Sequence, residues 1–145
     1  MWQRVQTLYL AIATGLLAAM FFSVKAVVPH TDGTEAESFR YISYIPYLIL
    51  LIIAVLLDFL ALTTWKHRIF QMRTAVLAAI ITIALQVWLA VDYFSTSDVM
   101  VFRFTAVFPI IAAIVDFMAS RAIFSDQLMV ESFSRLRSSK RRRRK

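Results

Sequence analysis

Residues 52–61 read IIAVLLDFLA, an apolar run that contains a single carboxylate, Asp58. Residues 110–119 read IIAAIVDFMA and place Asp116 at the same position of the run, with six of the ten residues identical. A charged group within such a run is costly in lipid, so it usually faces a partner inside the protein. The two segments therefore indicate membrane-spanning helices that turn their acids toward the interior of a bundle.

The composition of the whole chain also indicates a membrane protein. Of the 145 residues 60% are apolar and 17% are charged, and the mean hydropathy is +0.69, whereas soluble domains have about 45–50% apolar residues. The chain has no cysteine, which excludes disulfides, thiolate nucleophiles and cysteine-based metal sites. The net charge of +7 is concentrated in one place, because six of the 16 basic residues are the last six of the chain.

Four apolar segments are long enough to cross a bilayer, which takes about 20 residues of helix. Backbone amides find no water in the hydrocarbon core, so a spanning segment is a helix or part of a closed barrel. The runs are continuous rather than alternating, which excludes the barrel pattern. The sequence therefore predicts an all-α membrane protein whose residues 1–124 form a four-helix transmembrane bundle. The spans are expected at about residues 5–24, 44–65, 74–93 and 101–120.

Lysine and arginine are unevenly distributed over the connections between these spans. Thirteen of the 16 lie on the side of the two termini and the central loop, and three lie on the opposite side. Because positively charged segments stay in the cytoplasm, we expect both termini to be cytoplasmic. Aromatic residues fall at the expected membrane boundaries, as interfacial belts do. They are Trp2, Trp65, Tyr41, Tyr44, Tyr47 and Tyr93.

The first span also has features of a secretory signal peptide, with a charged start and a Val-Lys-Ala sequence that could end the signal at Ala26. Its apolar stretch of about twenty residues is longer than the apolar region of an ordinary signal peptide. We therefore expect this segment to be retained as a membrane span.

Helical spacing places both aspartates on faces made of small residues. Asp58 and Asp116 each have an alanine four residues before and another three residues after, and residues at these separations are neighbours on a helix. Small residues allow helices in lipid to approach closely, and packing and hydrogen bonds then drive their association. We expect these faces to point into the bundle, together with two others. They are Ala11, Gly15 and Ala19 in the first span, and Ala75, Ala79, Thr82, Gln86 and Ala90 in the third.

Two interpretations of the aspartates remain open, a polar clamp that fixes the bundle and a pathway for protons or cations. Transport sites usually lie near the membrane midplane on interrupted helices, whereas both aspartates are expected in the cytoplasmic half, so we favour the clamp. The candidate partners are Thr14 and Thr82 for Asp58, and Arg73 or Arg121 for Asp116. The candidate site as a whole, clamp or proton site, comprises Asp58, Asp116, Thr14, Thr82 and Gln86.

Residues 125–145 are predicted to form a separate cytoplasmic segment. Ser125 is a candidate helix N-cap, and the apolar residues Met129, Phe133 and Leu136 then follow on one face, which predicts an amphipathic helix on the inner leaflet. The cations of this segment would bind anionic lipid head groups, or alternatively the phosphates of RNA, for instance on a ribosome at the membrane. They are Arg135, Arg137, Lys140, Arg141, Arg142, Arg143, Arg144 and Lys145.

Catalytic motifs are missing from the sequence, which has no HExxH, GxSxG or P-loop pattern. His30 with Asp32, Glu35 and Glu37 falls short of the ligand sets that metals prefer. We therefore expect no enzyme activity, no cofactor and no metal site.

Three stretches resemble a known family. MWQRVQTLYL at residues 1–10, WKHRIFQMR at 65–73 and ASRAIFSDQLMVESFSRLR at 119–137 are similar to a small four-span integral membrane family of Bacteroidota, the domain-of-unknown-function family 4293. The likeness covers nearly the whole chain and implies a four-span topology in the bacterial inner membrane, without implying an activity. The family is more charged after the fourth span, and the departures from it here are Phe124, Gln127 and Met129.

Together these features predict a non-enzymatic structural or accessory subunit of a membrane complex, with protein partners and the lipid bilayer as its surroundings. One alternative is a small proton- or ion-coupled transporter component that uses Asp58 and Asp116. Another is a membrane protein that contacts a ribosome or RNA through its basic tail.

Overall fold

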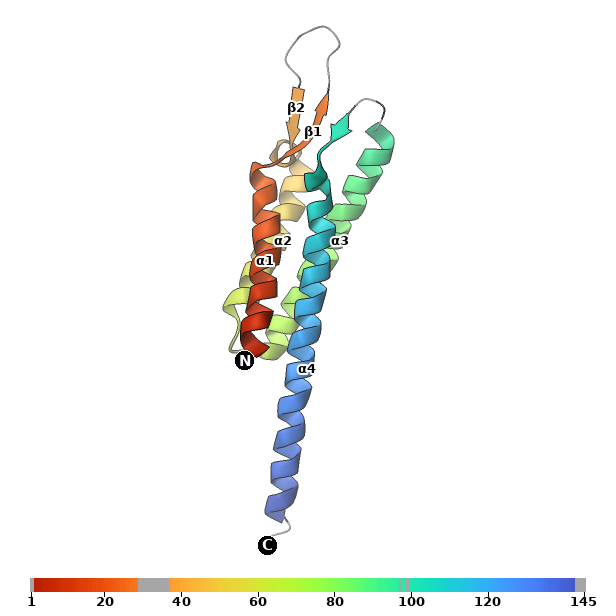
Figure 1. Cartoon of the computed structure of the whole chain (residues 1–145). Coiled ribbons are helices and arrows are strands. Elements are labelled where there is room, and N and C mark those ends of the chain that lie inside the picture. Colours follow the sequence, from red (N-terminus) through yellow and green to blue (C-terminus); the bar gives the residue numbers. More distant parts are fainter. Residues whose placement is uncertain (1, 29–36, 97, 99, 143–145) are drawn as a thin grey trace.

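Four long helices make up most of the structure, a computed structural model that describes residues 2–28, 37–96, 98 and 100–142. As the sequence predicts, all four are long and apolar enough to cross a membrane, and they run side by side along one axis (Figure 1). They are α1 (Trp2–Phe22), α2 (Ile45–Thr63), α3 (Arg68–Thr96) and α4 (Phe108–Arg142).

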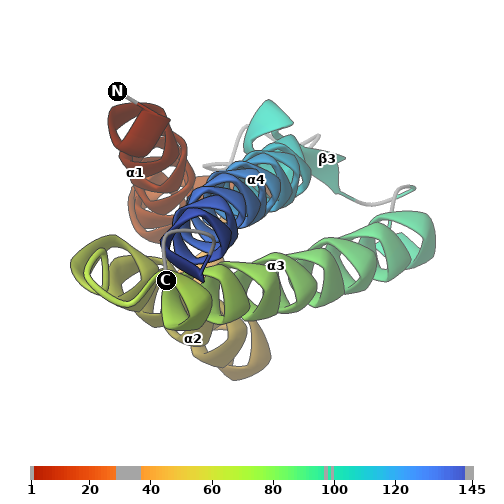
Figure 2. The ribbon, with the colours of Figure 1, turned by 90° about the horizontal axis from the view of Figure 1, so that it is seen from below.

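Contacts between neighbouring helices close the bundle. α4 lies between α1 and α3 (Figure 2), and α2 packs against α3 and α1, so α2 and α4 face each other diagonally across the interior. Small residues line these contacts, because close packing replaces the hydrophobic drive that lipid does not supply. The fully buried alanines include Ala54 and Ala61 of α2, Ala75 and Ala78 of α3, and Ala112 and Ala119 of α4.

The buried face of α1 differs from the predicted one. Ala11, Gly15 and Ala19 are exposed, and a side-chain carbon placed on Gly15 would meet no atom within 4 Å. Larger side chains fill the space between α1 and its neighbours, so the small residues lie on the outward face. The buried residues of α1 include Leu10, Ala13, Leu17 and Met20.

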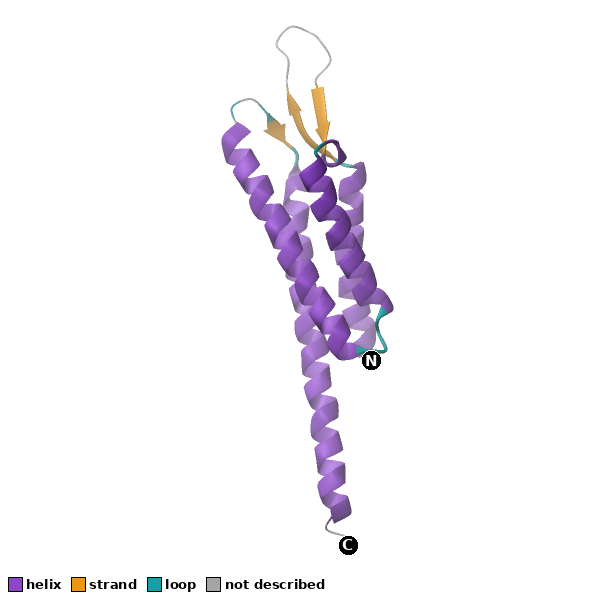
Figure 3. Ribbon diagram, turned by 180° about the vertical axis from the view of Figure 1, so that it is seen from behind, coloured by secondary structure: helices purple, strands orange, loops and turns teal. Residues whose placement is uncertain are grey.

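A small antiparallel sheet covers one end of the bundle, which we call the sheet end (Figure 3). Its strands are β1 (Val24–Val28), β2 (Glu37–Arg40) and β3 (Val101–Phe102), in the order β2-β1-β3. The sequence predicts loops and span ends here, and this prediction is wrong. Ala26 pairs with both Phe39 and Phe102, so β3, which has only two residues, depends on a partner strand that is distant in sequence.

The fourth helix begins later than its predicted span. The strand β3 is followed by a short 3-10 helix, Phe104–Val107. Helix α4 then starts at Phe108 with Pro109 in its first turn, a position that suits proline. The N–H of Arg103 donates to the carbonyl of Lys25 at 3.1 Å. This bond holds the segment before α4 to the sheet, so the apolar run from residue 101 is divided between strand and helix.

The opposite end, which we call the terminal end, carries the start of α1 and the turn between α2 and α3. There α4 continues without a break to Arg142 and extends well past the other helices (Figures 1 and 3). The predicted separate helix that starts at Ser125 is therefore not formed. The Ser125 hydroxyl donates to the carbonyl of Ala122 at 2.9 Å within α4, and no glycine or proline follows Pro109 to end the helix. We call residues 127–142 the α4 extension.

Candidate functional site

Asp58 and Asp116 lie in the interior of the bundle. Neither has any exposed surface, and they project from α2 and α4, the helices that face each other diagonally. The alanines that flank each aspartate at helical spacing are fully buried as well. Both carboxyl groups therefore point inward, as the alanine faces predict.

The two carboxyl groups meet across the centre of the bundle. They are close enough for a hydrogen bond between the two side chains when one of them carries a proton, and no other residue that the structure describes donates to any of their four oxygens. Two ionised carboxylates side by side in an apolar interior repel each other strongly. The arrangement can hold one proton, or a small cation, between the two acids.

The hydrogen-bond partners predicted for the aspartates are bonded elsewhere or point away. Thr14 and Thr82 each donate to the carbonyl four residues earlier in their own helix, at 2.7 Å. The Gln86 side chain accepts a hydrogen bond of 3.2 Å from a backbone N–H in the first turn of α4, and Arg73 and Arg121 are exposed. Threonine in a helix readily satisfies its hydroxyl one turn back, so none of these predicted partners donates a hydrogen bond to the aspartates.

Apolar layers enclose the aspartate pair on both sides. One buried cluster, toward the sheet end, includes Ala54 and Ala112, and another, toward the terminal end, includes Ala61 and Ala119. Each aspartate lies between its two alanines along the helix, so the pair sits at the boundary between the clusters. These layers keep the surroundings of the carboxyl groups apolar, which strengthens every electrostatic interaction between them.

A charged cluster at the sheet end has no counterpart in the sequence prediction. Lys25 of β1 forms an ion pair with Asp92 of α3, and the Tyr47 hydroxyl donates to the same carboxylate at 2.8 Å. The Lys25 ammonium also lies 4.7 Å from the centroid of the Tyr47 ring. Tyr47 is only 1% exposed, so its predicted place in an interfacial belt is wrong. Lys25 and Asp92 fall at the same boundary of two spans, and this shared depth is the signal that would have suggested the pair.

Tyr41 is a second tyrosine that is buried rather than interfacial. It lies in a 3-10 helix outside the spans, and its hydroxyl is 3.2 Å from the Thr105 hydroxyl. Burial raises the pKa of Tyr41, and the hydrogen bond with Thr105 offsets part of that rise. Together with the Lys25 cluster, this contact fixes the strand and loop segments on top of the helices.

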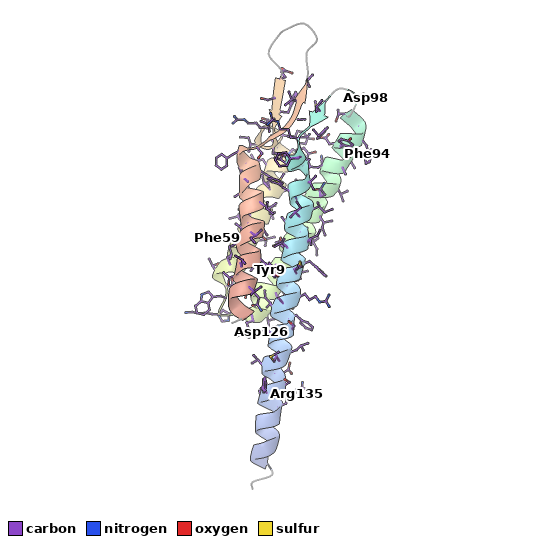
Figure 4. The ribbon with its side chains drawn as sticks, in the orientation of Figure 1. Tyr9, Phe59, Phe94, Asp98, Asp126 and Arg135 are labelled. Atoms are coloured by element: carbon purple, nitrogen blue, oxygen red, sulfur yellow. The ribbon has the colours of Figure 1, made fainter. Side chains whose placement is uncertain are left out.

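Two polar contacts fasten α4 where it leaves the bundle at the terminal end. The Gln6 side chain of α1 donates to the carbonyl of Ala122 at 3.1 Å, and Arg68 at the start of α3 pairs with Asp126 at 2.6 Å. Figure 4 places Asp126 at the edge of the bundle and Arg135 on the helix beyond it. The bundle therefore ends at the level of these contacts.

The α4 extension carries apolar side chains that are exposed over half or more of their surface. The exposed fraction is between 50% and 65% for Leu128, Met129, Val130 and Phe133. The predicted basic cluster begins in the same segment, where Arg135 pairs with Glu131 at 2.6 Å. Residues 137–142 of the cluster are helical in backbone, and residues 143–145 lie outside the described part.

Metal ligands do not gather in the part of the chain that the structure describes, where no group of three histidine, cysteine, aspartate or glutamate side chains comes together. The loop histidine His30 and its neighbours Asp32 and Glu35 lie outside the described residues.

Comparison with known proteins confirms the resemblance to the domain-of-unknown-function family 4293. A family model described as a domain of unknown function, DUF4293, matches residues 2–136. No curated protein matches the chain.

Proposed function

The chain belongs to the domain-of-unknown-function family DUF4293, and from this premise we propose that it is a non-enzymatic accessory subunit of a larger complex in the bacterial cytoplasmic membrane. In this proposal the four apolar helices span the membrane and both ends of the chain are cytoplasmic. The charge distribution supports this sidedness, because the terminal end carries the excess of lysine and arginine and such segments stay in the cytoplasm.

One observation carries the proposal, namely the exposed apolar surface of the α4 extension. Contiguous apolar surface outside a membrane usually marks a site where another molecule binds. The extension continues α4 in a straight line away from the bundle (Figure 1) instead of turning to lie against the membrane. This direction favours a protein partner over the lipid surface as the cover for Met129 and Phe133.

The test replaces Met129 and Phe133 with glutamate in the full-length protein. The M129E/F133E variant is expected to insert normally, because both positions lie beyond the bundle, and to lose proteins that co-purify with the wild type in mild detergent. S132E/S134E is the matched control, since it adds the same two charges to exposed positions of the same segment, and it should keep those partners. Partners retained by M129E/F133E, or lost equally from both variants, would contradict the proposal.

A second function, a proton-carrying site, is favoured by the missing donors around Asp58 and Asp116. An acid inside a membrane protein marks a functional site by default, and the hydrogen bonds that a clamp requires are not supplied by the threonines. Proton flux into liposomes that contain the wild type should then disappear in D58N/D116N while thermal unfolding remains cooperative. T82V is the control and should conduct as the wild type does. Wild-type liposomes that show no flux above empty ones would exclude this second function.

A further inference from the structure

We propose that the terminal end holds a binding site for the phosphate group of an anionic phospholipid. The site is a cavity of about 950 Å³ between the α2–α3 turn and the α4 extension. Its polar lining includes Lys66, Arg68 and Arg73 together with Gln127, Glu131 and Ser134. The site is distinct from the basic tail, and it stands whether or not the protein is an accessory subunit.

Two of the charged residues in this lining are already neutralised by partners. Arg68 pairs with Asp126 at 2.6 Å, and Glu131 pairs with Arg135 at 2.6 Å. The pair between Arg68 and Asp126 joins the start of α3 to α4, and so it fixes the two helices that line the cavity relative to each other. Glu131 is the acid in this lining that could repel an anionic ligand, and its carboxylate is paired with the guanidinium group of Arg135.

Lys66 and Arg73 remain as the cations that a ligand can use. Both are exposed, and neither forms an ion pair with a described residue. The Lys66 ammonium lies 5.6 Å from the centroid of the Trp65 ring, which orients it without neutralising it. A group with one or two negative charges is therefore the complementary ligand for this cavity.

The first turn of α3 adds backbone donors to these cations. The N–H of Gln71 donates to the carbonyl of His67 at 2.9 Å, and the amides of residues 68–70, just before it, have no acceptor within the helix. All three of these residues line the cavity. Uncommitted amides and the positive end of the helix dipole favour a phosphate oxygen at this place.

The depth of the cavity and its apolar wall favour a lipid as the source of the phosphate. The apolar helix α2 ends at Thr63 and the next begins at Arg68, so the cavity between them lies at the level of lipid head groups. Ile69, Phe70 and Val130 also line it and are each 52–54% exposed. The glycerol portion of a phospholipid can lie against this wall, from which a soluble phosphate would gain nothing.

Native mass spectrometry of the full-length protein tests the site. The protein is mixed in detergent with equal amounts of phosphatidylglycerol and phosphatidylcholine of the same acyl chains, and the wild type is expected to retain the phosphatidylglycerol preferentially. Each cation near an anionic head group contributes about fivefold to binding, so K66Q/R73Q should lower the affinity roughly thirtyfold. The control R40Q/R103Q removes the same charge from exposed positions at the sheet end and should bind as the wild type does.

Further arms of this experiment distinguish binding in the cavity from binding to the basic tail and from binding of soluble phosphate. V130W places a bulky indole ring in the cavity but keeps every charge, and it should also lose the lipid, while a chain that lacks Lys140–Lys145 should retain it. Inorganic phosphate at the same concentration should not displace the lipid. Unchanged lipid retention by K66Q/R73Q or V130W would overturn the proposal, as would loss of the lipid with the tail or its displacement by inorganic phosphate.

Discussion

Arg68 and Asp126 form an ion pair of 2.6 Å at the point where α4 leaves the bundle, with side chains that are 31% and 20% exposed. Removing one partner leaves a partly buried charge without its counterpart, so D126N is expected to lower the free energy of unfolding by about 1 kcal/mol. Thermal unfolding in detergent measures the change. E131Q breaks the exposed pair with Arg135 and is expected to change stability by less than about 0.5 kcal/mol. Equal effects of D126N and E131Q would contradict the expectation that the partly buried ion pair contributes more to stability than the exposed one.

Opposite effects are expected when Asp58 is replaced by asparagine and by alanine. Asparagine has N–H donors, so D58N can donate to Asp116 and is expected to raise the free energy of unfolding by about 1 kcal/mol. D58A offers no donor and leaves a cavity beside a buried acid, and it should destabilise by about 2 kcal/mol. Chemical unfolding in detergent at neutral pH distinguishes the two. A stabilising D58A would show that Asp58 contributes only repulsion.

Replacing Thr82 with valine is expected to leave stability within about 0.5 kcal/mol of the wild type, because its hydroxyl bonds only to its own helix. Q86L, by contrast, removes the acceptor for a backbone N–H at the start of α4 and should cost about 1 kcal/mol. Both are measured by thermal unfolding in the same detergent. If T82V lowered the free energy of unfolding as much as Q86L does, Thr82 would have a hydrogen-bond partner outside its own helix, such as Asp58.

Tyr47 and Asp92 are expected to be energetically coupled at the sheet end. The hydroxyl of Tyr47 donates to a charged acceptor at 2.8 Å, and such bonds contribute about 1.5 kcal/mol or more. A double-mutant cycle with Y47F and D92N should therefore give a coupling of at least about 1 kcal/mol. As a distant reference, Y47F combined with D126N should be additive. Additivity of Y47F with D92N would mean that Lys25 alone satisfies the carboxylate.

Alkaline pH is expected to destabilise the sheet end through Tyr41. Since burial raises the pKa of this phenol above its ordinary value of 10.0, the folded chain holds the proton more tightly than the unfolded chain does. The resulting stability is fully present below about pH 10 and is lost as the pH rises through the folded pKa. The fall in unfolding temperature above about pH 10 should be shallower in Y41F than in the wild type. A fall of the same steepness in Y41F would contradict this role, and Y44F, at a half-exposed tyrosine, should behave as the wild type.

Features of the fold that depend on local composition were predictable from the sequence. Long apolar runs predict the four helices, since the backbone in lipid has few alternatives. The alanines around Asp58 and Asp116 predict their inward direction, because a buried acid and small residues at helical spacing mark the same face.

Features that depend on distant partners were not predictable in the same way. The small residues of α1 suggest a packing face, yet Gly15 is exposed. The side chains on the neighbouring helices decide which face of α1 packs against them, and the sequence of α1 alone does not contain that information. The strands require Ala26 to meet Phe102 across the chain. The Thr82 hydroxyl donates to a carbonyl of its own helix. Its position in the sequence would equally allow it to donate to a side chain on another helix. Helix α4 continues past Ser125 because no glycine or proline follows to end it. The presence of a residue type that often caps helices was not enough to start a new one.

Helix α4 is continuous from the interior of the bundle to the end of its extension. Asp116 and Phe133 belong to one helix and are 17 residues apart, about 25 Å at the rise of an α-helix. With no proline or glycine between them to act as a joint, the two residues are connected by one stiff helix. In the proposed complex, a partner bound at Phe133 would therefore contact the same helix that carries Asp116.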